Sequence, residues 1–140
     1  MRVLRLRAPG GPEQLAVEKA DRPQPGPGEA LVRVHAAAIT RGELEWPLDR
    51  LPAIPSYELS GVVEEVGSGV ADVAAGDEVL ALTPFDRDGV AADYAALPAE
   101  LLVPRPQALG HAESAAIPLP ALTACRGFST TAGSAWTSGC

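Results

Sequence analysis

The stretch that decides the fold runs from Leu51 to Pro84 and reads LPAIPSYELSGVVEEVGSGVADVAAGDEVLALTP. It contains two runs typical of strands, residues 59–66 and 78–82, joined by a connector rich in turn residues. β-branched residues bounded by glycine predict a strand closed by tight turns. Gly67, Gly69 and Gly76 offer the positive-φ backbone that such connections need. The stretch therefore predicts a strand and its return strand.

The rest of the chain predicts further short strands and little helix. Alternating or β-branched patterns predict strands over residues 2–7, 15–18, 30–39 and 90–97, and residues 101–106 are expected to form a short edge strand and an exit loop. A loop rich in proline and glycine covers residues 22–29. Thr40 is placed to cap a short helix over residues 41–46, and a second helix begins at His111 and is broken or restarted at Pro118 and Pro120. This pattern favours a mainly β fold, a partly open β-barrel with short helices.

Length, composition and charge limit the class of protein. The chain has 140 residues, of which 46% are hydrophobic and 21% charged, which suits one globular domain. Its net charge of −7 argues against nucleic acids and anionic membranes as partners, because both need a basic face. No apolar run approaches the ~18 residues of a membrane span. The N-terminal residues lack a signal peptide's apolar segment, so we expect a cytoplasmic protein.

The order of residues in the central stretch resembles the catalytic domain of the medium-chain dehydrogenase/reductase superfamily. The similarity lies in Leu51–Glu58, then in Gly61, Val63, Val66, Gly67, Val70 and the run Gly76–Val79. It implies a GroES-like fold for residues 1–124, and it implies that the Rossmann domain of full-length relatives is lacking. Ser56 stands where the family has a glycine, so we expect that turn to be built differently.

The metal ligands of zinc-dependent relatives are missing at the matching positions. Those relatives have a cysteine soon after the long strand and a histidine directly before the central glutamate. Here residues 39–43 hold no cysteine, and Tyr57 occupies the histidine position. His35 and His111 are interpreted as surface or satisfied core histidines. The resemblance therefore implies no zinc and no metal site.

What remains resembles the zinc-independent, quinone-oxidoreductase-like branch, in which NADPH gives a hydride to a quinone or small conjugated carbonyl. By position, the resemblance gives Thr40 and Tyr57 catalytic roles, and gives Thr40 and Thr123 contacts to the nicotinamide. Tyr57 either bonds to the substrate carbonyl or cofactor, or packs under the barrel mouth. Thr123 either contacts the nicotinamide or caps a helix turn. Glu58 either lies at the domain interface or holds its loop in place.

No glycine-rich dinucleotide motif follows a strand into a helix anywhere in the chain, and no nucleophile motif or P-loop is present. We therefore expect the catalytic-domain part of an NADPH-dependent oxidoreductase that alone neither binds NADPH tightly nor turns over. The alternative is a stand-alone, non-catalytic barrel used for binding or oligomerisation. A homodimer is one assembly that the resemblance allows.

The last residues leave the family pattern. Residues 125–140 read CRGFSTTAGSAWTSGC, a composition that favours coil. We expect this tail to be poorly ordered. One cause at the level of the gene is a one-base deletion near Cys125, because restoring a base gives codons for an amphipathic helix.

Overall fold

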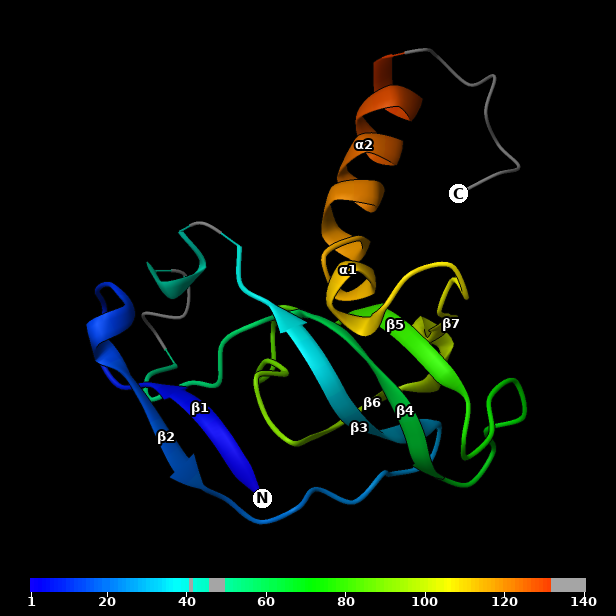
Figure 1. Cartoon of the computed structure of the whole chain (residues 1–140), viewed down its shortest axis with the longest axis horizontal. Coiled ribbons are helices and arrows are strands. Elements are labelled where there is room, and N and C mark those ends of the chain that lie inside the picture. Colours follow the sequence, from blue (N-terminus) through cyan, green and yellow to red (C-terminus); the bar gives the residue numbers. More distant parts are fainter. Residues whose placement is uncertain (41, 46–49, 132–140) are drawn as a thin grey trace.

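The computed structural model describes residues 1–40, 42–45 and 50–131, and its strands in these ranges form two antiparallel sheets (Figure 1). The smaller sheet pairs β1 (Arg2–Leu6) with β2 (Leu15–Lys19). The larger has the strand order β6-β3-β4-β5-β7. Its members are β3 (Glu29–Ala38), β4 (Glu58–Val66), β5 (Glu78–Leu82), β6 (Tyr94–Pro98) and β7 (Val103–Pro104).

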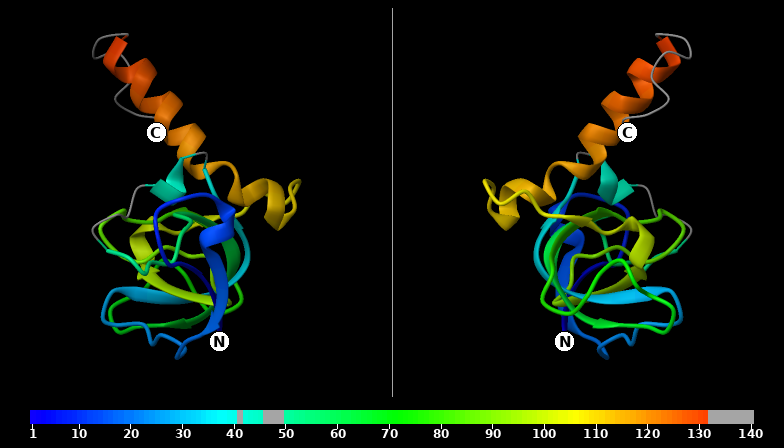
Figure 2. Two further views of the ribbon diagram at one scale, coloured as in Figure 1. Left: turned by 90° about the vertical axis from the view of Figure 1, so that its left-hand side faces the viewer. Right: turned by 90° about the vertical axis from the view of Figure 1, so that its right-hand side faces the viewer.

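Short helical elements fill the connections and the end of the described chain. Three are 3-10 turns, η1 (Pro12–Gln14), η2 (Glu43–Glu45) and η3 (Ala99–Leu101). Two are α-helices, α1 (His111–Ala115) and α2 (Pro118–Thr131). In every view α2 points away from the β body (Figures 1 and 2). No helix in the described ranges is long and apolar enough to cross a membrane.

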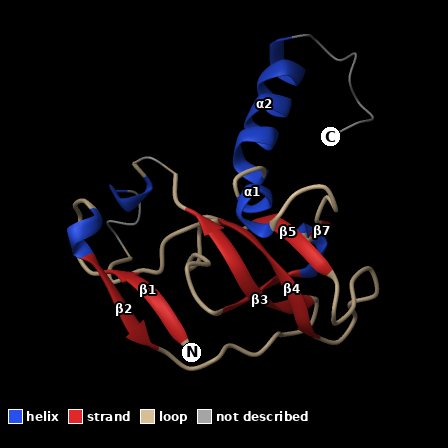
Figure 3. Cartoon of the chain, viewed as in Figure 1, coloured by secondary structure: helices blue, strands red, loops and turns tan. Residues whose placement is uncertain are grey.

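Backbone hydrogen bonds from β1 hold the two sheets together. The Leu4 N–H donates to the Ala91 carbonyl at 2.8 Å, and Leu6 and Ala53 exchange bonds of 2.8 and 3.0 Å. The small sheet thus closes one side of the larger one and leaves the sheets open elsewhere (Figure 3). The predicted mainly β, partly open architecture is confirmed.

The hydrophobic core lies between the large sheet and the segments that cross it. Its members come from strands far apart in the sequence, and the period-two pattern of each strand turns their side chains to one face. The fully buried members are Ala30, Val32, Leu59, Val63, Val79, Ala81, Val90 and Leu97. The two strands of the central stretch contribute half of this set, which is why that stretch decides the fold.

Most strand predictions agree with the structure, and two are corrected. β4 and β5 fall on the predicted runs, and two of the connecting glycines, Gly69 and Gly76, have φ of +83° and +98°. The strand predicted over 90–97 is confined to β6, because residues 90–93 bond to β1 and to the loop before β4 instead. The short edge strand predicted within residues 101–106 does not begin at Leu101, because that residue ends the turn η3, and it covers only Val103–Pro104.

The prediction of coil from Cys125 onward is wrong as far as Thr131, because α2 continues to that residue. Gly127 and the serine and threonines after it lie within the helix and do not end it before Thr131. A helix already nucleated at Pro118 gains one hydrogen bond for each residue added, so neutral residues extend it. The remainder of the predicted disordered tail, residues 132–140, lies outside the described residues, as do the ends of the helix predicted over 41–46.

Gly61 offers a test of how closely β3 and β4 approach. A Cβ at this position would lie 2.3 Å from the Arg33 carbonyl oxygen, beside a register shift in β3. Gly61→Ala must therefore push the strands apart, and we expect it to lower the free energy of unfolding by about 2 kcal/mol. The measurement is urea unfolding followed by circular dichroism.

The matched control is Gly26→Ala, whose Cβ would meet its nearest neighbour, the Glu29 side chain, at an ordinary 3.4 Å. We expect this variant to stay within about 0.5 kcal/mol of the parent protein. Equal stabilities of the two variants would contradict the close approach.

Candidate functional site

Thr40, Tyr57 and Glu58 lie in the segments where β3 leaves the large sheet and β4 enters it. Glu58, the first residue of β4, is 3% exposed. One carboxylate oxygen, Oε2, accepts a hydrogen bond of 3.4 Å from the Thr40 hydroxyl. The other, Oε1, accepts 2.8 Å from the Leu119 N–H in the first turn of α2. A carboxylate at a helix N-terminus is favourable, because the free N–H groups there carry partial positive charge.

A second buried carboxylate, Glu43 in η2, joins two loops. It is 2% exposed, and its Oε2 accepts a 2.9 Å bond from the Thr40 N–H while Oε1 accepts from the Ser56 N–H. Burial raises the pKa of Glu43, and the charge of Glu58 adds to the rise, although the two backbone bonds act in the opposite direction. Thr40 was predicted to cap this turn through its hydroxyl, but the hydroxyl bonds to Glu58 instead.

Ser56 adopts the backbone conformation for which the family uses glycine. Its φ is +71°, in the left-handed region that non-glycine residues rarely enter. The side chain offsets this strain by local bonds, because its hydroxyl reaches the Ala38 carbonyl at 2.8 Å and the Glu58 carbonyl at 3.1 Å. Serine thus occupies a conformation that favours glycine, and its own side-chain hydrogen bonds hold it there.

Tyr57 is packed under the rim of the barrel and is 4% exposed. Its ring lies 4.8 Å from the ring of Phe85, centroid to centroid, and its hydroxyl accepts a 3.3 Å bond from Arg50. Arg50 also donates to the Phe85 carbonyl. The ring thus fits the packing interpretation, while the hydroxyl retains a proton that it can donate.

The structure joins Thr40 to Glu58 by a hydrogen bond, whereas the side chain of Tyr57 contacts Arg50 and Phe85. Thr123 lies on the exposed surface of α2, four residues after Leu119. Two of the residues that contact these side chains or their loops were missed by sequence reasoning, Glu43 and Arg50. The only signal for Arg50 was a cation seven residues before Tyr57 in a loop.

Comparison with known proteins places this geometry in a family. Residues 26–107 match the model of the alcohol dehydrogenase GroES-like domain. The chain belongs to this family. The chain is 32% identical over 134 residues to a chloroplast envelope quinone oxidoreductase homolog of Arabidopsis thaliana. This match covers 89% of the chain and 40% of that protein. It is 36% identical to a zinc-type alcohol dehydrogenase-like protein of Schizosaccharomyces pombe, over 84% of the chain and 41% of that protein.

Solved structures agree with the sequence comparison. The Escherichia coli quinone oxidoreductase complexed with NADPH superposes with a TM-score of 0.82 at 26% identity, over 94% of this chain and 41% of that one. The GroES-like domain thus spans about two fifths of the length of its relatives. These relatives belong to the medium-chain dehydrogenase/reductase superfamily, and the predicted resemblance and fold are confirmed.

The donors at the site do not fit a zinc ion. A catalytic zinc needs three protein ligands and an open position. The carboxylate oxygens of Glu43 and Glu58 already accept hydrogen bonds from backbone N–H groups and from the Thr40 hydroxyl. The Tyr57 hydroxyl accepts one from Arg50. Among residues 1–40, 42–45 and 50–131, no three His, Cys, Asp or Glu side chains gather in a metal-binding arrangement. Zinc independence remains a proposal.

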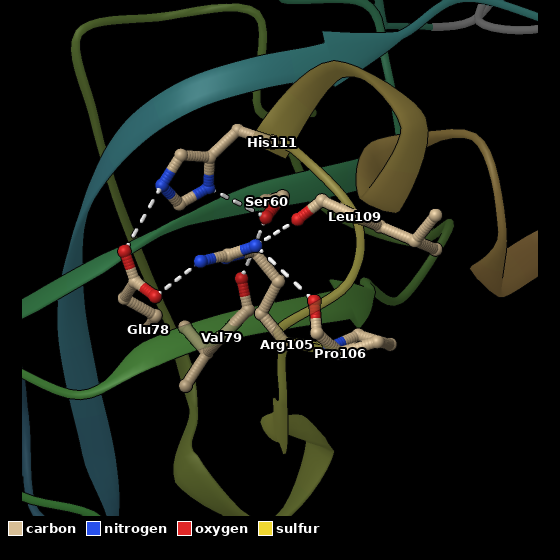
Figure 4. Close-up of polar contacts among 7 residues, drawn as sticks. All are labelled: Ser60, Glu78, Val79, Arg105, Pro106, Leu109 and His111. Carbon is tan, nitrogen blue, oxygen red and sulfur yellow. Dashed lines mark hydrogen bonds and ion pairs between the residues drawn. The ribbon is translucent and has the colours of Figure 1, made fainter.

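His111 lies in a separate polar cluster where α1 meets the large sheet (Figure 4). The Ser60 hydroxyl gives its proton to the Val79 carbonyl at 3.0 Å, so Nδ1 of His111 is assigned as the donor in its 2.8 Å contact with Ser60. Nε2 of His111 lies 3.8 Å from Glu78, and its ring stacks on His35 at 4.4 Å. His111 is a satisfied histidine, as predicted.

Acid is expected to weaken the attachment of α1. Burial lowers the pKa of His111, helped by the charges of His35, Arg105 and Arg33 and opposed by Glu78. A depressed folded-state pKa means that the stabilisation is complete above the unfolded value of about 6.5. It is lost as the pH falls from there toward the folded-state pKa, because the unfolded chain takes up the proton first.

We expect the free energy of unfolding to fall between pH 7.5 and 5.5 more steeply in the parent protein than in His111→Asn, which keeps a donor for Ser60. The measurement is urea unfolding across this range, with His35→Asn as the variant that removes the stacked ring and the charge of His35 but keeps His111. Identical slopes for the parent protein and His111→Asn would contradict the assignment.

Ser56 gives a second prediction. Ser56→Ala removes both hydroxyl bonds and keeps the strained φ, so we expect it to lower the free energy of unfolding by about 1–3 kcal/mol. Ser56→Gly also loses the bonds but relieves the backbone strain, so it should be more stable than the alanine variant by about 1 kcal/mol. Thermal and urea unfolding measure both. An alanine variant as stable as the glycine variant would show that the turn carries no strain.

Proposed function

We propose that this chain is the GroES-like, substrate-side part of an NADPH-dependent, zinc-independent oxidoreductase that reduces quinones or small conjugated carbonyls. The observation that carries the proposal is the group of hydroxyls at the barrel rim, Thr40 and Tyr57, which Glu58 and Arg50 hold in place of a metal-ligand set. The solved relative complexed with NADPH supports the choice of cofactor.

The chemistry follows from these donors. NADPH supplies a hydride, and negative charge then develops on the acceptor's oxygen. Hydrogen-bond donors fixed beforehand near that oxygen stabilise the charge without reorganisation. Tyr57 is suited to this role because Arg50 occupies its oxygen and leaves its proton for the acceptor. Thr40, with its hydroxyl on Glu58, keeps its oxygen as an acceptor for the nicotinamide amide.

Cofactor binding by the described residues is limited to the nicotinamide end. Thr40 and Thr123 are the contacts that the resemblance gives, and Thr123 is exposed on α2. The pyrophosphate of a dinucleotide is usually bound at a glycine-rich helix start, a motif that the sequence lacks. We therefore infer that this chain alone does not bind NADPH tightly.

Partners and location belong to the same proposal. A net charge of −7 disfavours nucleic acids and anionic membranes. A small carbonyl or quinone is thus the proposed substrate, and the cytoplasm the proposed location, on the evidence of the sequence.

A fusion protein tests the function. Residues 1–131 replace the matching part of the Escherichia coli quinone oxidoreductase, and NADPH oxidation is followed with 1,4-benzoquinone as acceptor. We expect quinone-dependent oxidation that a zinc chelator leaves unchanged, whereas the isolated chain gives none. NADPH binding to the fusion protein reports that it has folded.

Thr40→Val and Tyr57→Phe should each lower kcat/KM of the fusion protein, the latter by about tenfold or more, because each removes a polar group at the reacting end. Val17→Thr, an exposed change on β2, is the control. A fusion protein that binds NADPH but reduces no quinone or conjugated carbonyl would favour the non-catalytic module. Loss of activity on chelation would contradict zinc independence.

A further inference from the structure

Arg50 is a half-buried cation at the rim of the site, in the loop that leads into β4. Its Nη2 donates to the Tyr57 hydroxyl at 3.3 Å and to the Phe85 carbonyl. A guanidinium carries five N–H donors in a planar fork. Within the described residues, Nη1 and Nε of Arg50 enter no hydrogen bond, so part of the fork remains available to a ligand.

Its lack of a carboxylate partner sets Arg50 apart from most arginines of the β body. The arginines that form ion pairs within 4.0 Å are Arg2, Arg5, Arg7, Arg22, Arg33, Arg87 and Arg105. No carboxylate of the described residues pairs with Arg50 in this way, although the chain has 18 acidic side chains and a net charge of −7. In so acidic a protein, an arginine without an acidic partner leaves a local positive site.

Two aromatic rings lie beside this charge. Arg50 touches the hydroxyl of one and the backbone of the other, and the rings of Tyr57 and Phe85 are tilted by 57° at 4.8 Å. Phe85 is 45% exposed, so part of its face or edge meets solvent. A planar conjugated molecule gains contact area on such a ring, while its charged oxygen gains a charge-assisted hydrogen bond from the guanidinium.

We propose that Arg50 is a specificity residue that selects planar, conjugated acceptors carrying an ionised oxygen over neutral ones of the same shape. This inference rests on the proposed function, because it names the class of substrate for that site. The guanidinium is the ligand for the charged oxygen, and the exposed ring of Phe85 is the surface against which the conjugated plane lies.

Binding to the 140-residue chain tests the inference without turnover. The probes are 2-hydroxy-1,4-naphthoquinone, which is ionised at pH 7.5, and 2-methoxy-1,4-naphthoquinone, which is neutral and of similar shape. Isothermal calorimetry gives the two Kd values. We expect the ionised probe to bind about tenfold more tightly, the size of effect typical of one charge-assisted hydrogen bond.

Variants of Arg50 test whether this residue causes the preference for the ionised probe. Arg50→Gln should remove the preference by weakening the binding of the ionised probe more than that of the neutral one, whereas Arg50→Lys should keep most of the preference. Arg7→Gln, which makes the same change of charge on the exposed β1 and β2 side, is the matched control and should bind like the parent protein. Circular dichroism confirms that each variant is folded.

Equal binding of the two probes by the parent protein, no binding of either, or an unchanged preference in Arg50→Gln would each overturn the inference. Competition by millimolar inorganic phosphate that is as strong as competition by the ionised probe would show a general anion site and overturn the requirement for a conjugated plane. The fusion protein separates the two proposals. If it reduces no quinone while the charge preference holds, the proposed function fails and the binding site stands.

Discussion

The arrangement of the whole site depends on the buried carboxylate of Glu58. It joins three segments that are far apart in the sequence: the start of β4, the Thr40 loop after β3, and the first turn of α2. An ionised carboxylate removed from water is costly unless donors replace the lost hydration. Here a hydroxyl and a helix N–H do so, and the resulting bonds fix both the rim of the barrel and the point from which α2 leaves it.

Glu43 is a second buried carboxylate whose lost hydration is replaced by hydrogen-bond donors, and its closeness to Glu58 adds electrostatic repulsion. Two buried carboxylates repel, and burial together with the Glu58 charge raises the pKa of Glu43. Each side chain is nevertheless bound to backbone N–H groups, so their placement depends on the path of the chain at Thr40, Ser56 and Leu119. The positive φ of Ser56 is part of that path. A change at this turn is therefore felt by the carboxylates, by Tyr57 and by the origin of α2 together.

The sequence predicted the parts of this structure that follow from local pattern. β4 and its return strand β5 were predicted because β-branched residues bounded by glycines are followed by a turn-rich connector, and the candidate roles of Thr40 and Tyr57 came from the resemblance. Glu43 and Arg50 were missed because a charged residue in a loop is usually solvated, and only tertiary packing buries one and leaves the other without an acidic partner. The extension of α2 past Cys125 was missed because composition describes a segment alone, whereas a helix already begun continues through neutral residues.

The same packing explains why Arg50 forms no ion pair with the buried acids Glu43 and Glu58. The oxygens of Glu43 and Glu58 are buried and already accept hydrogen bonds, so an ion pair would require breaking bonds that hold the loops. Within the described residues, Arg50 instead donates to the neutral oxygens of Tyr57 and Phe85 and forms no ion pair. The carboxylates thus serve to position the chain, and the cation at the rim is the group to which we assign the contact with a charged ligand.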